Sequence, residues 1–488
     1  MARIVVVGAG VGGLAAAARL ARQRHDVVVC EQAQVVGGKL GEFVRDGFRF
    51  DTGPSLLTLP AVYRDLFRAT GEPLEEVCEL LPVDPAVRYL FPDGTVLDVP
   101  NTGAEDVCAA IEATLGAGSG RQWQGLLDRG AAIWEVTHES VLQSPLDGPR
   151  DLLRRLRGVS DLRTVAPWRT LSGVGARCLD DPWLRMVLDR YATYAGSDPR
   201  RAPAALATIP YVEQTFGSWY VRGGLRRLGE AVAERARAAG AVLRTGADVA
   251  AIDLEGGRVA GVRLTTGERL PADAVVSNAD ASHLYRDLVA APAALRRLDR
   301  ATPSLAGFVL LLGVRNRTLG LAHHTVLFPA DYAAEFDAIF GPAPRPVPDP
   351  TLYVAVADDP LVAPPGDESW FVLVIAPRQG PVDWTADGVA AGYAGRLLDL
   401  LARRGLDVRD RLAFCEWRSP ADLERATRSP GGAIYGTSSN GLRAAFLRPA
   451  NRSPVPGLFL VGGSAHPGGG LPLVAMSAGI VSRLIGPA

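Results

Sequence analysis

Apolar and polar residues alternate in short blocks at the start of the chain. Ile4–Val7 is an apolar run rich in β-branched residues, which predicts a buried strand. The glycine-rich segment Gly8–Gly13 follows at once, and the Ala- and Leu-rich stretch Leu14–Ala21 then predicts a helix. After a polar break, the apolar run Val27–Cys30 predicts a second strand, which Glu31 closes. We therefore expect a strand, a glycine turn, a helix, a second strand and an acid in this order.

This order of elements indicates a dinucleotide-binding unit. Gly8 permits the tight turn, Gly10 lets the backbone approach a pyrophosphate, and Gly13 lets the helix pack close to the strand. The N-terminus of the helix presents free N–H groups to the phosphates. Glu31 follows the glycines by about twenty residues, where a carboxylate binds the 2′-hydroxyl of an adenosine ribose.

The rest of the chain mixes period-two and helical patterns. Asp-Gly pairs between alternating residues predict hairpins at Phe43–Phe50 and Arg88–Val99. Three- and four-residue spacing predicts helices over Glu105–Leu115, Gln122–His138, Asp181–Tyr194, Leu225–Ala239, Gly388–Arg404 and Pro472–Ile485. Apolar runs predict strands at Val242–Arg244, Val249–Leu254, Arg258–Thr265, Ala274–Ser277, Leu305–Val314, Leu352–Val356, Trp370–Ile375 and Leu458–Val461. The proline-rich residues 341–350 form either a mobile lid or an inert connector.

Composition narrows the class of protein. A length of 488 residues predicts two or three domains, and a net charge of −1 argues against a nucleic-acid partner. The five cysteines are scattered without a C-x-x-C pair, as expected of reduced thiols in a cytoplasmic protein rather than of disulfides or a zinc site. We expect no secretory signal and no membrane-spanning helix. His323 and His324 suggest no metal site, because neighbouring side chains diverge and no third ligand is evident.

Several motifs resemble the phytoene desaturase, or carotenoid desaturase, branch of the flavin amine oxidase-like proteins. Near the N-terminus these are Gly8–Gly13 with Glu31, Val36–Lys39 and Asp51–Pro54. The central and C-terminal motifs, which are more specific, are Tyr191–Tyr194, Phe216–Gly224, Gly431–Gly436 and Pro456–Pro472. The resemblance covers nearly the whole chain. It implies an α/β fold with a Rossmann-like FAD-binding domain of the GR2 type, discontinuous in sequence, and an inserted α+β substrate domain. We assign residues 1–75, 222–290 and 412–488 to the FAD-binding domain, and 76–221 and 291–411 to the substrate-binding domain.

The resemblance also implies which residues contact FAD. They are Gly8, Gly10, Val11, Gly12, Gly13, Glu31, Gly37, Gly38, Lys39, Gly53, Pro54, Ser55, Val249, Gly462, Gly463, Leu473, Val474 and Ser477. Lys39 would offset pyrophosphate charge, although many relatives carry arginine there, and a solvated surface lysine is the alternative. Val249 would hold the adenine through its backbone or is plain core. The helix from Pro472 would aim its N-terminus at the flavin and stabilise negative charge on the reduced ring. Asp280 either lies near the adenosine or caps the next helix.

Most of the residues that could transfer a proton or bind the substrate allow two interpretations. His466 either moves a proton or makes a structural hydrogen bond. Glu213 and Tyr220 are further proton acceptors to consider. Tyr211, Phe216, Trp219 and Tyr220 either line a substrate tunnel or pack in the core. Residues 150–170 combine six arginines and two aspartates with leucines and a tryptophan, so this segment either rests on anionic lipid or is a solvated helix face.

The resemblance implies an FAD-dependent oxidoreductase acting on CH–CH groups. The expected reaction removes hydride from an allylic C–H of an acyclic carotenoid, either of the phytoene type or in a later 3,4-desaturation, and passes it to flavin N5. Oxygen or a quinone would then take the electrons, and the enzyme would sit peripherally on the cytoplasmic membrane face. Alternatives on the same scaffold are a carotenoid ketolase, an isomerase, a polyene saturase or an amine oxidase. A flavin-free prenyl-lipid binding protein, similar to Rab GDP dissociation inhibitor, is the alternative of another class.

Overall fold

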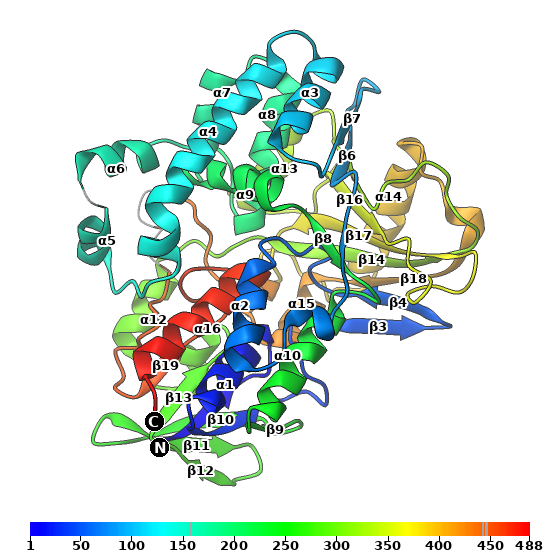
Figure 1. Ribbon diagram of the computed structural model, residues 1–488. Coiled ribbons are helices and arrows are strands. Elements are labelled where there is room, and N and C mark those ends of the chain that lie inside the picture. The colour runs from blue at the N-terminus through cyan, green and yellow to red at the C-terminus, as the bar shows by residue number, and fades with distance from the viewer. Residues whose placement is uncertain (157, 442–443, 445–447) are drawn as a thin grey trace.

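The computed structural model describes residues 1–156, 158–441, 444 and 448–488. A five-stranded sheet, whose neighbouring strands are all parallel, forms the lower part of the molecule in Figure 1. Its strand order is β19 (Leu458–Leu460), β13 (Ala274–Ser277), β1 (Arg3–Val7), β2 (Asp26–Cys30) and β9 (Val242–Arg244). The sheet takes its strands from three separate parts of the chain. The expected α/β class with a Rossmann-like sheet is confirmed.

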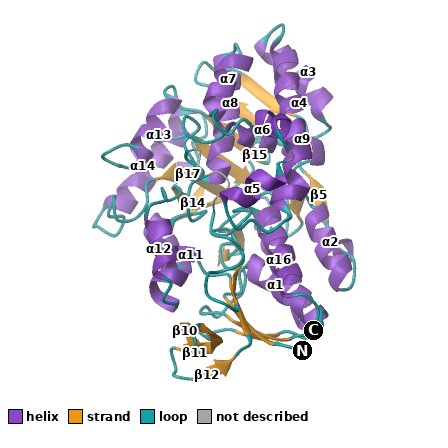
Figure 2. Ribbon diagram, turned by 90° about the vertical axis from the view of Figure 1, so that its left-hand side faces the viewer, coloured by secondary structure: helices purple, strands orange, loops and turns teal. Residues whose placement is uncertain are grey.

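Strand β1 is buried on both faces because its side chains alternate between two layers. Ile4 and Val6 pack into a cluster with the helices α1 (Val11–Arg22), α2 (Ala61–Thr70), α10 (Arg226–Ala238) and α16 (Leu471–Ile485). Val5 and Val7 pack toward an antiparallel sheet of β10 (Val249–Glu255), β11 (Arg258–Leu264) and β12 (Arg269–Pro271). This small sheet lies at the bottom of both ribbon views, close to the two termini (Figures 1 and 2).

A seven-stranded mixed sheet forms the second structural centre. Its order is β18 (Leu412–Arg418), β14 (Ala306–Val314), β17 (Glu368–Ala376), β16 (Leu352–Val356), β15 (His324–Leu327), β6 (Val87–Leu90) and β7 (Val96–Val99). Every residue of β14 is buried, since Leu310 faces a cluster that includes helix α14 (Val389–Arg403) and Leu311 faces the opposite side. Because β18 belongs to this sheet, the segment that we assigned to the FAD-binding domain from residue 412 contains one strand of the other sheet.

Helices gather at the upper end and along the upper left side of the molecule (Figure 1). They are α3 (Ala104–Leu115), α4 (Ser119–Thr137), α5 (Pro149–Arg155), α6 (Val159–Val165), α7 (Leu171–Cys178), α8 (Pro182–Arg190), α9 (Thr208–Phe216) and α13 (Tyr332–Phe340). A buried core joins several of them to strands β6 and β7, with Trp123 of α4 and Tyr191 after α8 among its largest side chains. The expected helix over Asp181–Tyr194 ends at Arg190 and continues as a 3-10 turn.

Short elements complete the fold. They are β3 (Glu42–Arg45), β4 (Phe48–Asp51), β5 (Leu80–Pro82), β8 (Trp219–Val221), α11 (Ala281–His283), α12 (Pro292–Asp299) and α15 (Pro420–Thr427). The β3–β4 hairpin turns at Asp46 and Gly47, both with positive φ, as the Asp-Gly pair predicted. The proline-rich loop 341–350 is tied down, because the hydroxyl of Tyr393 donates to Val347 O at 3.1 Å and Arg404 donates to Pro350 O at 2.9 Å. These bonds fit a connector rather than a lid.

Candidate functional site

The first turn of helix α1 lies unusually close to strand β1. A Cβ added to Gly13 would overlap the carbonyl oxygen of Gly8, so only glycine permits this approach. Gly8 itself has a φ of 94°, which favours glycine. Gly10 caps the helix without a side-chain hydrogen bond, and the first N–H groups of α1 are therefore free to bind an external acceptor.

The side chain of Asn278 joins the first glycine turn to the last one. A Cβ on Gly10 would lie 2.5 Å from its Nδ2, and one on Gly12 would lie 2.7 Å from its Oδ1. A Cβ on Gly462 would lie 2.5 Å from the same oxygen, and the Cβ of a residue at position 12 would lie 3.1 Å from the Gly462 Cα. The N-terminal turn and the turn after β19, which are far apart in sequence, therefore form one continuous wall.

Glu31 lies at the end of β2 beside this wall. Its Oε2 accepts a hydrogen bond from the N–H of Ala9 at 2.7 Å, and its Oε1 accepts one from the N–H of Ala33 at 2.9 Å. Only 8% of the residue is exposed. Because each carboxylate oxygen carries a second lone pair, Glu31 can still accept a hydrogen bond from a ribose hydroxyl.

A cavity of about 380 Å³, the first cavity, runs along this wall. Fourteen of the expected FAD contacts line it, namely Gly8, Gly10, Val11, Gly12, Glu31, Gly37, Gly38, Lys39, Gly53, Pro54, Val249, Gly462, Gly463 and Val474. The cavity begins at the β1 turn and ends at Gly469–Leu471, at the start of α16. It is an extended space of the kind that a dinucleotide fills.

Charged side chains that the sequence analysis did not single out also line the first cavity. Arg428 and Arg418 both face it. Arg428 forms a two-pronged ion pair with Asp248, with both N···O distances at 2.8 Å. The hydrogen bond and the negative charge of Asp248 raise the pKa of Arg428, so this cation is permanent. No local sequence signal marks either arginine, because the chain brings them to the cavity from a distant segment.

Lys39 directs its ammonium group toward the chain rather than toward open space. Its Nζ donates to Ala433 O at 3.1 Å and to Ile434 O at 2.6 Å. Burial lowers the pKa of Lys39, and the negative charge of Asp280 partly offsets this effect. Asp280 caps helix α11 by accepting from the N–H of Ser282 at 2.9 Å, as the helix-cap interpretation predicted. Its Oδ2 is buried without a hydrogen-bond partner among the described residues, and the residue lines the first cavity.

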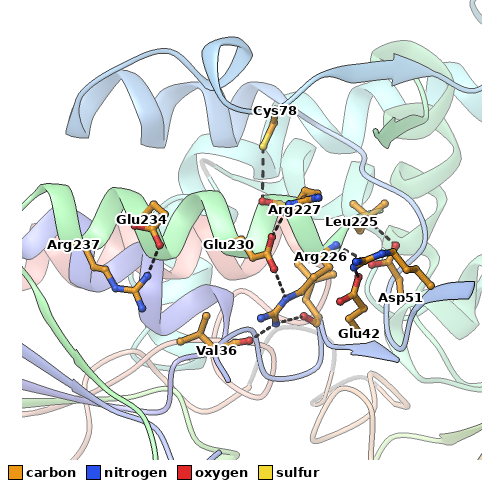
Figure 3. Close-up of polar contacts among 12 residues, drawn as sticks. Val36, Glu42, Asp51, Cys78, Leu225, Arg226, Arg227, Glu230, Glu234 and Arg237 are labelled. Atoms are coloured by element: carbon orange, nitrogen blue, oxygen red, sulfur yellow. Dashed lines mark hydrogen bonds and ion pairs between the residues drawn. The ribbon is translucent and has the colours of Figure 1, made fainter. Parts of the chain in front are cut away.

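The loops that carry Gly37–Lys39 and Gly53–Ser55 are held by the start of helix α10 (Figure 3). The carboxylate of Asp51 accepts from the N–H groups of Leu225 at 2.7 Å and Arg226 at 2.8 Å. The guanidinium of Arg226 donates to the carbonyl oxygens of Val36 and Leu40. Burial raises the pKa of Asp51 to about 6. One buried helix start therefore fixes both loops.

Helix α16 begins where the first cavity ends. Its N-terminus carries the positive end of the helix dipole to this point. Val474 lines the first cavity, whereas Leu473 lines the second cavity described below. Ser477 lies outside both cavities, because it is one helical turn further on and its Oγ donates to His466 O at 2.8 Å. Its side chain makes a buried structural bond, and its expected contact with the flavin stays a prediction.

A second cavity, of about 430 Å³, begins where the first one ends. The two share a wall made of Gly53, Pro54, Phe371, Leu373, Ile434, Tyr435, Gly469, Gly470 and Leu471. Beyond this wall the lining is mostly apolar, with Trp134 of α4, Ile209 and Val212 of α9, and Ile375 of β17. Ser55 lies on this side of the wall, and its Oγ is 2.7 Å from the hydroxyl of Tyr353.

The three candidates for proton transfer differ in position. Glu213 lines the second cavity, its Oε1 accepts from the hydroxyl of Tyr191 at 2.7 Å, and burial raises its pKa. His466 also lines it, but its Nε2 is held by Val141 O at 2.9 Å, which fits the structural hydrogen bond. Tyr220 lies outside both cavities, since it packs in the core and its hydroxyl donates to Asp359 at 3.0 Å.

Of the two interpretations of the aromatic residues before Gly223, the structure favours core packing over tunnel lining. None of Tyr211, Phe216, Trp219 and Tyr220 lines the second cavity as the described residues define it. Trp219 packs against the hydrophobic core of the five-stranded sheet, and Phe216 is 38% exposed. The polar groups that do face the cavity include Arg190, Glu335 and Tyr353, none of which the sequence analysis singled out.

The described part of the chain lacks both a metal-binding cluster and a membrane-spanning helix. No group of three or more His, Cys, Asp or Glu residues there is arranged to hold a metal ion. No helix among the same residues is long and apolar enough to cross a bilayer. His324 stacks on Tyr353 and its Nδ1 lies 3.2 Å from Ala86 O, so the paired histidines serve as packing groups.

The residues of the first cavity fit FAD. A side chain at Gly10, Gly12 or Gly462 would meet Asn278, so the glycines keep this side of the cavity open. The free N–H groups of α1 suit a pyrophosphate, and the carboxylate of Glu31 suits a ribose hydroxyl. At the other end, the start of α16 suits a flavin ring that becomes negatively charged. The cavity is continuous between these two ends.

Comparison with known proteins agrees with this fit. The family described as flavin containing amine oxidoreductase matches residues 11–326. A 4,4'-diapolycopene oxygenase of Methylomonas sp is 34% identical, over 98% of this chain and 97% of that protein. A zeta-carotene-forming phytoene desaturase of Myxococcus xanthus is 35% identical, over 99% of this chain and 93% of that protein.

Solved structures share the fold. A putrescine oxidase bound to putrescine superposes with a TM-score of 0.66 at 16% identity, covering 99% of this chain and 98% of that one. An oxidoreductase from Methanosarcina mazei gives a TM-score of 0.61 at 17% identity, covering 99% of this chain and 100% of that one. This chain belongs to the flavin-containing amine oxidoreductase family, among its carotenoid desaturase-like members, and is an FAD-dependent oxidoreductase.

Proposed function

We propose that the protein is a carotenoid desaturase that removes hydrogen from an acyclic polyene. The observation that carries this proposal is the wall shared by the two cavities. It contains Gly53 and Pro54, which are among the expected FAD contacts, and Gly469 and Gly470, which directly precede the start of α16. An apolar cavity on the other side of that wall suits a long hydrocarbon that presents one C–H bond to the ring.

The chain's own residues support this chemistry in three ways. When bound, FAD supplies a hydride acceptor at its N5. The start of α16, at Gly470 and Leu471, would stabilise negative charge on the ring. The apolar lining of the second cavity would exclude water and orient the substrate. Of the three proton-transfer candidates, only Glu213 both lines this cavity and has a carboxylate with no backbone hydrogen-bond partner among the described residues, so we assign it the proton released from the neighbouring carbon.

The names of the relatives support a carotenoid-type substrate and two different reactions, desaturation and oxygenation. The Myxococcus xanthus relative is named a desaturase and the Methylomonas relative an oxygenase. Desaturation inserts a double bond, whereas oxygenation adds oxygen to the same skeleton. We favour desaturation because the second cavity has a mostly apolar lining against the shared wall.

We also propose that residues 150–170 rest on a membrane surface. Leu153 of α5, Val159 of α6 and Trp168, which follows α6, are 59%, 65% and 54% exposed, and arginines lie between them in the sequence. Arg157, one of the six arginines in this segment, lies outside the described residues. Leu156 and Val165 pack on Ile133 of α4, which lines the second cavity. A membrane contact here would bring a lipid-dissolved polyene close to that cavity.

Expression in hosts that make phytoene, neurosporene or lycopene tests the proposal. We expect at least one of these pigments to lose hydrogen and to absorb at longer wavelength. The Gly10→Ala variant, whose new Cβ would meet Asn278, should lose this activity together with FAD. The Gly395→Ala variant has open space at its Cβ and should retain it. An unchanged pigment profile in all three hosts would overturn the proposal, and an oxygenated product would replace desaturation by oxygenation.

A further inference from the structure

A buried arginine faces the apolar second cavity. Arg190, the last residue of α8, is 7% exposed and lines the cavity. Its Nη1 donates to the hydroxyl of Tyr194 at 2.8 Å. Its Cζ lies 5.9, 5.1 and 5.5 Å from the ring centroids of Tyr89, Tyr194 and Tyr353. A cation placed in a hydrocarbon-binding space needs a reason, because burying a charge is costly.

The surrounding protein does not neutralise this cation by direct contact. Among the described residues, no carboxylate oxygen lies within 4.0 Å of Arg190. Glu213 is the carboxyl group whose charge acts on it from further away. The three tyrosine rings stabilise the charge through cation–π contacts, but a ring face accepts no strong hydrogen bond.

Donors on the guanidinium therefore remain available to a ligand. Arginine carries five N–H donors; the hydroxyl of Tyr194 accepts from Nη1, and a hydrogen bond from Arg190 also acts on the hydroxyl of Tyr89, which leaves the other donors for a ligand. The Nε atoms of Arg129 and Arg235 are sealed in the protein without partners, but no nitrogen of Arg190 is sealed in this way. Its free donors point to an oxygen atom in the cavity.

Arg190 also stands close to the wall at which the flavin ring is expected. Its guanidinium lies over the ring of Tyr353, and the Tyr353 hydroxyl is 2.7 Å from Ser55 Oγ. Ser55 directly follows Gly53 and Pro54 of the shared wall. An oxygen atom bound by Arg190 would therefore belong to the end of the substrate that reacts, not to its remote end.

We propose that Arg190 hydrogen-bonds an oxygen atom on the end group of the polyene, and that the site prefers a hydroxyl- or carbonyl-bearing end over a plain hydrocarbon. The inference rests on the proposed function and specifies its substrate class. Tyr194, which is hydrogen-bonded to the arginine, and Glu213, which belongs to the same lining, would complete the polar surroundings of this oxygen. A site that hydrogen-bonds one substrate oxygen discriminates strongly against the analogue that lacks it.

Binding measurements on the FAD-loaded protein test this preference. The probes are lycopene and the same carbon chain carrying one terminal hydroxyl, one terminal aldehyde or one terminal carboxylate, each in detergent micelles, with quenching of tryptophan fluorescence as the readout. We expect the hydroxyl or aldehyde form to bind about 10- to 100-fold more tightly than lycopene, the factor that one hydrogen bond to a charged group gives. Arg190→Met should bring this ratio close to one. Arg190→Lys should retain part of it, because a lysine keeps the charge and loses the fork.

Arg185→Met is the matched control. Arg185 lies on the same helix and donates to Leu179 O at 2.7 Å, but it does not line the second cavity. The control should keep the binding ratio of the wild type.

Equal binding of lycopene and the oxygenated chains by the wild type would overturn the inference, and so would a ratio that survives in Arg190→Met. If the carboxylate form alone binds tightly, the end-group class is wrong. If Arg190→Met does not fold, the ratio in Arg190→Lys decides. Failure of every polyene to bind would instead refute the proposed function.

Discussion

Replacing Gly13 by alanine should push helix α1 away from the wall that holds the cofactor. The added Cβ would overlap the carbonyl oxygen of Gly8 and would lie 3.0 Å from the Cβ of Asn278. Neither atom can rotate away, because one belongs to the backbone and the other is fixed to it. The start of α1 therefore has to move by about 1 Å in a close-packed environment.

Two effects of different size follow. Overpacking of this kind costs about 1–3 kcal/mol, and the better helix propensity of alanine returns up to about 1 kcal/mol. The apoprotein should thus lose about 1–2 kcal/mol of stability. FAD affinity should fall about 100-fold, since a 1 Å displacement of a positioned group has an effect of that order. Thermal unfolding of the apoprotein measures the first effect, and a flavin-fluorescence titration measures the second.

Gly395→Ala provides the matched control in helix α14. Its Cβ would have no neighbour within 4 Å. This substitution should stabilise the protein by about 0.5–1 kcal/mol and leave the dissociation constant of FAD unchanged. If Gly13→Ala behaves in the same way as this control, the close approach of α1 to β1 does not shape the cofactor site, and the reasoning fails.

Three further predictions concern the carboxylates of Glu31, Asp280 and Asp51. Glu31→Gln weakens the bond to Ala9 N and should raise the dissociation constant of FAD about tenfold. The dissociation constant of flavin mononucleotide, which lacks adenosine, should not change, and equal effects on both would contradict the assignment of Glu31 to the adenosine ribose. Asp280→Asn keeps the cap of α11 but removes the charge of the Oδ2 atom, which has no partner among the described residues. The melting temperature of the apoprotein should stay the same, and FAD affinity should fall about tenfold. A change in melting temperature alone would show that Asp280 is purely structural. The pKa of Asp51 is about 6 in the folded protein against an ordinary value of 3.8, so its contribution to stability is most favourable below about pH 4 and declines as the pH rises through about 6. The unfolding free energy of the wild type minus that of Asp51→Asn should therefore fall by up to about 3 kcal/mol over this range, and a flat difference would refute the pKa shift.

The sequence predicted the sheets and the glycine turns well, because these depend on local patterns. The runs Ile4–Val7 and Leu305–Val314 are uniformly apolar, as strands buried on both faces require, and both form such strands. The Asp46-Gly47 pair specifies its turn by backbone conformation alone. Such signals need no knowledge of distant residues.

Residues of the site that depend on long-range contacts could not be predicted in this way. Arg190 is one arginine among many until the fold places Tyr89 and Tyr353 around it. Arg428 reaches the first cavity because it pairs with Asp248, a distant residue. Tyr220 lies outside both cavities, and its hydroxyl is bonded to Asp359, a residue of another segment. An aromatic residue near a motif does not reveal which of its faces meets the core.

Anaerobic mixing of the FAD-loaded protein with a polyene in liposomes tests the central claim most directly. The absorbance of the oxidised flavin is the readout, with lycopene and its terminally hydroxylated form as substrates. The account predicts that the flavin band bleaches in a single turnover and that an equal amount of polyene appears with two hydrogens fewer. A flavin that stays oxidised while the polyene is bound would contradict it.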